Sequence, residues 1–494
     1  MSHTSSFYLS YLLRSRLSHS AVSQAKQCHA QILLQGLLPN ATLQTDLLLV
    51  YSRCGLLRHA RQVFDGMLRK NMHSWNIMIA SHVQNSLYSD AIAVFCKFQR
   101  MGLRPDHYTL PPLFKASIGV GDTCLGKTCH ALVIKLGYDE YVVVGSCLLE
   151  SYAESGAMSE ARCVFSDMSF KDSAAWNLMI SRFARTGLYM DALNCLRGMI
   201  LNKVKIDSMT FPSVLNACGR EGDLIKGKEV HGQIVRGFMF SADAAIGNAL
   251  IDMYGKCGSL NYAETVFKTM TDVNLVTWTT MISCYGMHGK GEESLHLFKK
   301  MIDIGFNPNP VTLTSILASC SHSGLVDQGM QIFNSIHSEY GFEPSVEHYA
   351  CIVDLLGRCG YLVEALQILE SMKSSATTSI WGALLAGCVM QKNVKIGEIA
   401  ANRLFQIEPY NASNYIALCS IYETQGMLEG VSSVRAKLRD LDLAKAPGYS
   451  GINIAGRFHK FYQGNLSLPL EHIIHEISFQ ISKPEMTDDC EQCD

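Results

Sequence analysis

One seventeen-residue pattern occurs four times along this chain. It reads YSRCGLLRHARQVFDGM at 51–67, and it returns, with changes, at 152–168, 254–270 and 356–372. The spacings are 101, 102 and 102 residues for its glycines, Gly55, Gly156, Gly258 and Gly360. Two other sets recur with the same period, namely Trp75, Trp176 and Trp278, and His29, His130 and His231. Markers that share one period indicate an internal repeat, which restricts the chain to an array of similar stacked units.

A period of about 102 residues is longer than one helical repeat unit, so each period must subdivide. Similar patterns occur three times within it: an apolar helix, a short turn, a second amphipathic helix and a loop. In 51–67 we expect Gly55 to end the first helix, and Val63, Phe64 and Met67 to share one buried face of the second. Strand alternation is absent throughout. The predicted segments, of about 35, 31 and 35 residues in rotation, are 6–40, 41–71, 72–106, 107–141, 142–172, 173–207, 208–243, 244–274, 275–309, 310–345 and 346–377.

The bulk composition excludes some classes. The 42 basic and 44 acidic residues nearly cancel, so net charge gives no support to binding of a polyanion. No apolar run reaches the roughly 18 residues of a membrane span. The 18 cysteines are scattered, and we expect most to be small buried residues in a reducing compartment, including Cys147, Cys163, Cys218, Cys257 and Cys320.

The first 45 residues contain no Asp or Glu, while they hold Arg14, Arg16, Lys26 and many serines. This composition is typical of an organellar transit peptide. A helical repeat that happens to lack acidic residues would give the same composition, and both interpretations can hold together. We therefore predict a targeting segment over 1–40 that overlaps a first repeat.

Several stretches carry a family resemblance. SWNIMI, AAWNLMI and TWTTMI open one kind of unit, GKTCHALVIKLGY and GKEVHGQIVRGF belong to a second, and 51–67 belongs to a third. They resemble the P, L and S motifs of plant pentatricopeptide repeat proteins, and the resemblance covers roughly 6–465. It implies an all-α fold, a right-handed superhelical solenoid of helix-turn-helix repeats with its array at 41–377, and it makes the first repeat L-type.

The region after 377 resembles the E-type extension of the same subfamily, over 378–465, with a tail at 466–494. Its Tyr415, Leu418, Tyr422 and Gly426 follow a tetratricopeptide-like pattern, and such units usually present a groove to a protein partner. The stretch GNLSLP at 464–469 departs from the family, whose usual Gly-Asp-x-Ser-His-Pro has an Asp and a His that are missing here.

The resemblance implies that single-stranded RNA is read at about one base per repeat by the fifth and final residues of each motif. The P-motif pairs are Asn76/Asp106, Asn177/Asp207 and Thr279/Asn309. The S-motif pairs are Thr45/Asn71, Ser146/Asp172 and Asn248/Asn274. Such residues could instead be helix caps or loop residues. Six pairs at one register, all from the short polar set, favour base reading.

Other repeats are weaker readers. The L motifs place Pro111 and Pro212 at the fifth position, and because proline has no side-chain donor we expect these repeats to act as spacers. Thr314/Ser345 and Ala350/Thr377 are also weak. With RNA running 5′ to 3′ from the N-terminal repeat, the family pairings imply the core A-U-n-G-U-n-Y-A, where Y is a pyrimidine. A few Lys and Arg on the concave face would contact phosphates.

The subfamily often ends in a zinc cytidine deaminase domain, which needs His-x-Glu and a later Cys-x-x-Cys. The nearest matches do not combine. His337 to Glu339 is predicted to be a solvated helix face, and Cys490 and Cys493 lack a second ligand pair nearby. His475-Glu476 has Phe479 where a second histidine would be needed, and only 29 residues follow Asn465. We expect no catalytic residues, metal or cofactor.

Four functions follow from these observations. The first is an RNA-binding specificity factor for organellar C-to-U editing, which recruits a DYW-type deaminase or an editing accessory protein in trans through the E-type extension. The second is the same module acting in splicing, processing or stability of organellar transcripts. A protein–protein scaffold is less favoured because of the polar pairs, and an intrinsic deaminase lacks its motif. We expect a mitochondrial protein that binds no membrane, with the chloroplast as the alternative.

Overall fold

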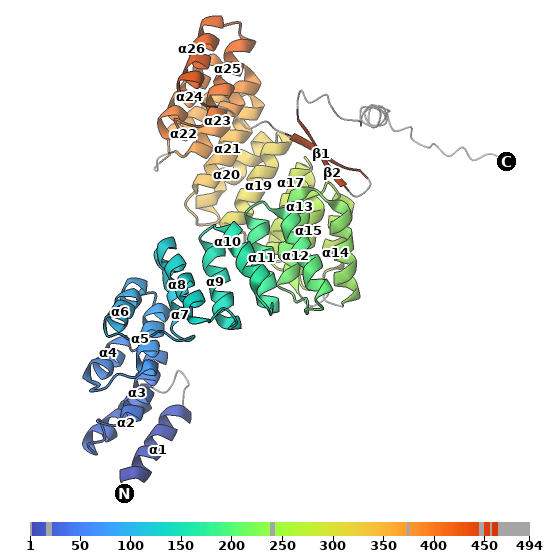
Figure 1. The fold of residues 1–494 in the computed structure, drawn as a ribbon. Coiled ribbons are helices and arrows are strands. Elements are labelled where there is room, and N and C mark those ends of the chain that lie inside the picture. The colour runs from blue at the N-terminus through green and yellow to red at the C-terminus, as the bar shows by residue number, and fades with distance from the viewer. Residues whose placement is uncertain are drawn as a thin grey trace, which may run out of the picture. The chain divides into compact units, whose positions relative to one another are not determined.

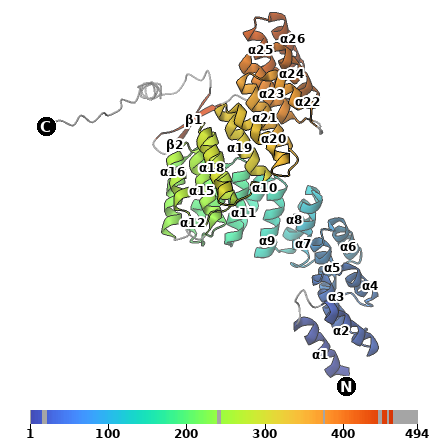
Figure 2. The same ribbon diagram turned by 180° about the vertical axis from the view of Figure 1, so that it is seen from behind.

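The computed structural model describes residues 2–15, 22–237, 243–372, 376–443, 449–454 and 457–462. The chain divides into two compact units, 1–221 and 222–494, which are described separately. Helices make up almost all of both units, and they follow one another in chain order in Figure 1 and, seen from behind, in Figure 2.

Unit 1 consists of helix pairs. Its helices are α1 (Ser2–Ser15), α2 (Val22–Leu34), α3 (Ala41–Arg53), α4 (Leu57–Gly66), α5 (Met72–Gln84), α6 (Tyr88–Arg100), α7 (Leu110–Val120), α8 (Thr123–Leu136), α9 (Val142–Glu154), α10 (Met158–Asp167), α11 (Ser173–Arg185), α12 (Tyr189–Leu201) and α13 (Thr210–Glu221).

Unit 2 continues the same pattern and ends in two strands. Its helices are α14 (Leu224–Arg236), α15 (Ala244–Lys256), α16 (Leu260–Thr269), α17 (Leu275–Met287), α18 (Gly291–Asp303), α19 (Pro310–Ser323), α20 (Val326–Ser338), α21 (Val346–Cys359), α22 (Leu362–Glu370), α23 (Thr378–Gln391), α24 (Val394–Ile407), α25 (Ala412–Thr424) and α26 (Leu428–Asp440). The strands are β1 (Tyr449–Ile454) and β2 (Arg457–Tyr462).

The pair α3–α4 shows how the sequence forms a unit. Asn40 caps α3, because its side-chain oxygen accepts the backbone N–H groups of Thr42 and Leu43. Gly55 follows the helix with a φ of +71°, a left-handed conformation that suits glycine. In α4 and just after it, Val63, Phe64 and Met67 are all buried. Both predictions for this unit are confirmed.

Neighbouring pairs stack through their first helices, so that α5 contacts both α3 and α7, and α17 contacts both α15 and α19. The repeated tryptophans lie at these junctions. The ring of Trp75 meets that of Phe64 edge-on at 4.9 Å between centroids. The same contact measures 4.7 Å for Phe165–Trp176 and 5.2 Å for Phe267–Trp278. The predicted all-α solenoid is confirmed, while the handedness of its superhelix stays a prediction.

The repeated histidines join an L motif to the S motif that follows. The Nδ1 atom of His130 lies 2.8 Å from the hydroxyl oxygen of Tyr152, and the equivalent distances are 3.0 Å for His29–Tyr51 and 2.8 Å for His231–Tyr254. Burial lowers the pKa of each of these histidines and raises that of Tyr254 to about 12. Each pair therefore favours the neutral imidazole.

Most predicted segments begin where a helix begins, namely at α3, α5, α9, α11, α15, α17, α19 and α21. The segments that begin at 107 and 208 differ: α7 begins at Leu110 rather than 107, and α13 at Thr210 rather than 208. In α7 the reason is a turn in which the backbone N–H of Thr109 binds the carbonyl oxygen of Asp106. The domain boundaries at 41–377 and 378–465 stay predictions.

The prediction that strands are absent was wrong at one place. Strands β1 and β2 pair antiparallel, with Tyr449 opposite Tyr462 and Ile454 opposite Arg457. Their sequences, YSGINI and RFHKFY, are rich in the β-branched and aromatic residues that favour strands. Two residues separate them in the sequence, which is the shortest common hairpin spacing. A search for helical repeats misses so short a hairpin.

Cysteine burial was predicted only in part. Cys218 and Cys320 are buried, Cys147 and Cys257 are half-buried, and none of these four forms a disulfide bond. Cys163 is exposed, so that prediction was wrong. The buried residues of α10 are Ala161, Val164 and Phe165, and Cys163 lies outside this face.

None of the helices within the described residues is long and apolar enough to cross a bilayer.

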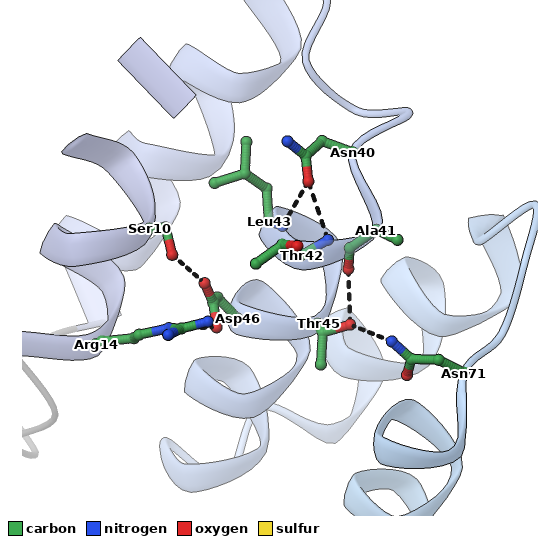
Figure 3. A network of polar contacts seen from close by, with 9 residues as sticks. All are labelled: Ser10, Arg14, Asn40, Ala41, Thr42, Leu43, Thr45, Asp46 and Asn71. Carbon is green, nitrogen blue, oxygen red and sulfur yellow. Dashed lines mark hydrogen bonds and ion pairs between the residues drawn. The ribbon is translucent and has the colours of Figure 1, made fainter. Parts of the chain in front are cut away.

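The acid-free N-terminal stretch forms helices that pack on the array. In Figure 3 the hydroxyl of Ser10 donates to the Oδ2 atom of Asp46 at 2.5 Å, and Arg14 forms an ion pair with Oδ1 at 3.0 Å. The first acidic residue of the chain thus joins α1 to α3. Part of 1–40 therefore belongs to a repeat, and its targeting role stays a prediction. Arg16 lies outside the described residues.

Candidate nucleic-acid interface

The six predicted reading residues at the fifth position of their motifs share one place in the fold, because each is the fifth residue of the first helix of its repeat. In unit 1 they are Thr45, Asn76, Ser146 and Asn177, on α3, α5, α9 and α11; in unit 2 they are Asn248 and Thr279, on α15 and α17. A residue this far into a helix is no N-cap, so the capping interpretation does not apply to the fifth residues. All six side chains are buried or half-buried.

The final residues of the motifs do have a local structural role. Asn71, Asp172, Asn274 and Asn309 are the N-cap residues of the next first helix, and the side-chain oxygen of each accepts a backbone N–H of that helix. Asp106 and Asp207 accept similar bonds in the turns that precede α7 and α13. The capping interpretation is therefore correct for the final residues, and it leaves their remaining polar atoms for other contacts.

Two of the predicted pairs are joined directly. The Nδ2 atom of Asn76 lies 3.0 Å and 3.2 Å from the two carboxylate oxygens of Asp106. The same atoms of Asn177 and Asp207 lie 3.0 Å and 3.1 Å apart. A carboxylate only accepts, so it requires the amide nitrogen, not the oxygen, on its side. The orientation of both amides is fixed by this contact.

A third pair makes a weaker contact. The Nδ2 atom of Asn71 lies 3.5 Å from the Oγ1 atom of Thr45, at the limit for a hydrogen bond (Figure 3). The hydroxyl of Thr45 donates to the backbone carbonyl of Ala41 at 2.7 Å. Thr45 therefore has its proton committed to its own helix, and its oxygen faces Asn71.

The other three pairs have no direct bond. The Oγ atom of Ser146 and the Oδ1 atom of Asn248 are buried and have no hydrogen-bond partner. Thr279 reaches Asn309 only through a third residue, Thr312, whose hydroxyl lies 2.8 Å from that of Thr279 and 3.0 Å from the Oδ1 atom of Asn309. Buried polar atoms without partners are uncommon in folded proteins, and they are the groups that a polar ligand can satisfy.

The residues predicted to read weakly have hydroxyls that bond neighbouring groups of the chain, or they lack side-chain donors. Pro111 and Pro212 lie in the first turns of α7 and α13, where a missing backbone N–H costs nothing. The hydroxyl of Thr314 donates to the carbonyl of Pro310 at 2.9 Å, and Thr377 lies 2.8 Å from Ser379. Ser345, the partner of Thr314, caps α21.

A groove of about 430 Å³ in unit 1 brings two predicted readers together. Ser146 and Asn177 both line it, as do Lys115 of α7 and Glu150 of α9. Lys115 is an exposed cation within the same groove. The groove therefore offers polar side chains for a ligand edge, and its lining carries one positive charge, on Lys115, and one negative charge, on Glu150.

Comparison with known proteins decides the family. The PPR repeat model matches 45–72, 73–103, 174–204, 248–275, 311–339 and 347–375, a second PPR repeat family model matches 273–322, and an E motif model matches 391–453. A mitochondrial pentatricopeptide repeat-containing protein of Arabidopsis thaliana is 35% identical over 471 residues, which are 94% of this chain and 71% of the relative. The chain is a pentatricopeptide repeat protein.

A second relative agrees with this family, and a solved structure shares the fold. The chloroplastic pentatricopeptide repeat-containing protein CRR2 of Arabidopsis thaliana is 33% identical over 470 residues, 94% of this chain and 71% of that protein. The crystal structure of PPR10 in complex with an 18-nt psaJ RNA element superimposes with a TM-score of 0.63 at 16% identity, and covers 84% of this chain and 62% of the PPR10 chain. The predicted resemblance to E-type members is confirmed by the E motif.

This pentatricopeptide repeat protein also has exposed apolar residues that the sequence analysis missed. Each stands three residues before a fifth position, and the exposed fractions lie between 58% and 73% for Tyr108, Val143, Met209, Val276 and Val311. Large apolar side chains at a fixed register usually form a core. The signal was present in the sequence as an apolar second residue in the segments that begin at 107, 142, 208, 275 and 310, but only the structure shows that it faces solvent.

The candidate metal ligands do not come together within the described residues. His337 is 72% exposed at the end of α20, where it faces Glu343 at 3.5 Å, which agrees with the predicted solvated helix face. No group of three or more His, Cys, Asp or Glu side chains able to hold a metal ion occurs in the described part of the chain. Cys490, Cys493, His475, Glu476 and the stretch 464–469 lie outside the described residues.

Proposed function

We propose that this protein binds single-stranded organellar RNA and selects sites for C-to-U editing. The observation that carries the proposal is the pair of matching bonds Asn76–Asp106 and Asn177–Asp207, which repeat one geometry one period apart. The likeness to the fold of PPR10, which was crystallised with an RNA element, supports it. The printed names of relatives include mitochondrial and chloroplastic proteins, so we place the protein in an organelle, with the mitochondrion first.

The reading chemistry follows from the atoms that the amide of Asn76 keeps free. Its Nδ2 atom carries two hydrogens, and one is used by Asp106; its Oδ1 atom has two lone pairs, and one accepts the hydroxyl of Thr109 at 2.8 Å. One donor and one acceptor therefore remain. The Watson–Crick edge of uracil offers an N–H donor beside a carbonyl acceptor, which complements such an amide.

Affinity would come from neighbouring residues. The exposed apolar side chains three residues before the fifth positions, such as Val143 and Val276, offer faces on which a base can stack beside its reader. Lys115 offers a charge for a phosphate in the groove that holds Ser146 and Asn177. Stacking and single cations of this kind supply binding without a strongly basic chain, which reconciles the proposal with the balanced charge.

The editing reaction itself is assigned to a partner. We propose that the E-type extension, 378–465, recruits a DYW-type deaminase or an editing accessory protein in trans. The match of the E motif to 391–453 supports this, as does the helix pair α25–α26, in which Tyr415 and Leu418 form part of the buried face. Zinc-dependent hydrolysis of the cytosine amine would belong to the partner, and this chain would supply the position.

A second role, in splicing, processing or stability of transcripts, uses the same RNA interface and differs only in the partner. Sequencing organellar transcripts from plants that lack this protein separates the two. One lost C-to-U conversion that returns on complementation supports editing. An intron retained with every edit intact would contradict editing and favour the second role.

A further inference from the structure

A buried threonine follows each P motif of the array as the third residue of the next segment. The three are Thr109, Thr210 and Thr312, and none of them is exposed to solvent. Each stands at the start of a first helix or within its first turn, and each lies against the reading residue of the preceding P motif. Nothing in the two-residue pairing of fifth and final positions gives this third residue a role.

The contact is a hydrogen bond to the reader. The hydroxyl of Thr210 donates to the Oδ1 atom of Asn177 at 2.6 Å, and it lies farther, at 3.1 Å, from the nearer oxygen of Asp207. The equivalent hydroxyl of Thr109 lies 2.8 Å from the Oδ1 atom of Asn76 and also 2.8 Å from the Oδ1 atom of Asp106, so these two oxygens share its one proton. The amide of Asn177 is therefore held at both ends, with its nitrogen on Asp207 and its oxygen on Thr210, and the amide of Asn76 has the same neighbours.

In the third P motif the threonine is the whole connection. Thr279 makes no direct bond to Asn309, and the hydroxyl of Thr312 lies between them, 2.8 Å from one and 3.0 Å from the other. Thr279 also donates to the backbone carbonyl of Leu275 at 2.9 Å. The proton of Thr279 is therefore used within the helix, and the single proton of Thr312 can be donated either to the oxygen of Thr279 or to the Oδ1 atom of Asn309.

Helix capping explains part of this arrangement, but it does not explain the contact between the threonine and the reading residue of the preceding repeat. The backbone N–H of Asp106 binds the Oγ1 atom of Thr109, and the N–H of Thr109 binds Asp106 in return. Thr277 forms the same reciprocal cap with Asn274 at the start of α17. Yet the Oδ1 atom of Asn248, the fifth-position residue of the S motif that precedes Thr277, has no hydrogen-bond partner. A cap therefore does not require a bond to the reader.

We infer that Thr109, Thr210 and Thr312 are positioning residues for base reading, so that the reading unit after each P motif has three members rather than two. The inference rests on the proposed RNA binding. A hydroxyl that holds the Oδ1 atom of Asn76 or Asn177 sets the plane of the amide and hence the direction of its free donor and acceptor. Asn248 lacks this contact, and its pairing implies only a pyrimidine.

The test compares substitutions that remove the hydroxyl with ones that keep it. Thr109→Val and Thr210→Val keep the side-chain shape and remove the bond to the reader, while Thr109→Ser and Thr210→Ser keep the hydroxyl. Thr277→Val is the matched control, because it removes a capping hydroxyl that contacts the final residue Asn274 of a reading pair but not its fifth-position residue Asn248. Affinities are measured for the full chain with RNAs of the core A-U-n-G-U-n-Y-A in which only the second, fifth or seventh base changes between U and C, at fixed salt. Thermal unfolding confirms that each variant is folded.

The readout is the U-to-C affinity ratio at each base. Thr109→Val should reduce the ratio at the second base by about three- to tenfold, the worth of one hydrogen bond, and leave the fifth base unchanged. Thr210→Val should do the reverse, and each serine variant should keep the ratio of the wild type. Thr277→Val should lower the unfolding temperature without changing the ratio at the seventh base.

Three results would overturn the inference. They are unchanged ratios in both valine variants, equal losses at the second and fifth bases from a single substitution, and a loss at the seventh base from Thr277→Val. In each of these cases the proposed RNA binding still stands, provided that the wild-type protein binds the RNA and distinguishes U from C. A wild-type protein that does not distinguish the bases, or does not bind the RNA, would overturn the proposed function together with the inference.

Discussion

Asn177 donates from its Nδ2 atom to both carboxylate oxygens of Asp207, thirty residues further along the chain, and Asn76 does the same to Asp106. The bond links the fifth residue of one first helix to the turn before the next first helix. The orientation of each of these two amides therefore depends on the following repeat. In a solenoid only neighbouring units touch. A substitution in one pair should therefore act on one base and leave distant units unaltered.

Stability should fall as the pH is lowered through about 6.5. Burial lowers the pKa of His29, His130 and His231 in the folded chain below the ordinary value of 6.5, so the unfolded state binds more protons in this range. The free energy of unfolding then rises with pH between the folded and unfolded pKa values. Urea unfolding between about pH 5.5 and 7.5 measures it, and a variant with all three histidines replaced by asparagine should show a flatter slope. An equal slope in that variant would refute the assignment.

Two glycines of α23 should respond in opposite ways to alanine. A Cβ atom on Gly387 would lie 2.7 Å from the Cα atom of Gly357, a backbone atom of α21 that cannot turn aside. Gly387→Ala should therefore cost about 1–3 kcal/mol of unfolding free energy. Gly382, on the same helix, has open space at that position, so Gly382→Ala should stabilise by up to about 1 kcal/mol through helix propensity alone. Equal effects at both sites in chemical denaturation would contradict the close approach of α21 and α23.

Removal of 378–494 should leave RNA affinity largely intact and abolish editing in vivo, because the predicted readers all lie before 377. The cut exposes the face of α21 that α23 covers, and terminal units of a solenoid usually need a polar cap. A cut after 408, which keeps α23 and α24, is the matched control and should unfold at a higher temperature. Restoration of editing by either shortened protein would show that the removed part is not the recruiting surface.

The purified protein should contain no stoichiometric zinc and should not deaminate cytidine unaided. The reason lies in the sequence, in which no His-x-Glu is accompanied by a Cys-x-x-Cys that could complete one zinc site. Elemental analysis and a cytidine conversion assay measure the two properties. Zinc at one equivalent, lost when Cys490 and Cys493 are replaced by serine, would contradict the expected absence of zinc. Uridine formation by the protein alone would contradict the expected lack of deaminase activity.

Much of the fold could be predicted from the sequence because its elements repeat. Gly55 and Trp75 mark a helix end and a unit junction, and their spacing located most first helices to the residue. The hairpin β1–β2 could not be found this way, because it occurs once and its strands are short. The burial of Cys163 was predicted wrongly because cysteine is an apolar residue type, and Cys163 lies one position away from the buried face of α10.

The sequence shows the common register of the proposed reading pairs, but it does not show which pairs are bonded to one another. The sequence identifies Asn76 and Asp106 as a pair, yet it gives no reason to expect that Ser146 and Asp172 make no bond to one another. That difference depends on side-chain reach, since serine is shorter than asparagine. The role of Thr109 was also hidden, because a threonine near a helix start is an ordinary capping residue, and only the structure shows its contact with the preceding unit.

The most direct test of base reading is a swap at one reader. Asn76→Thr keeps Asp106 but replaces an amide by a hydroxyl, and the family pairings then imply G rather than U at the second base of the core. Binding of wild type and variant is measured with four RNAs that differ only at this base, at fixed salt. We expect the preference to move from U towards G, with discrimination worth about 1–3 kcal/mol. An unchanged preference for U in the folded variant would contradict the claim that Asn76 reads a base.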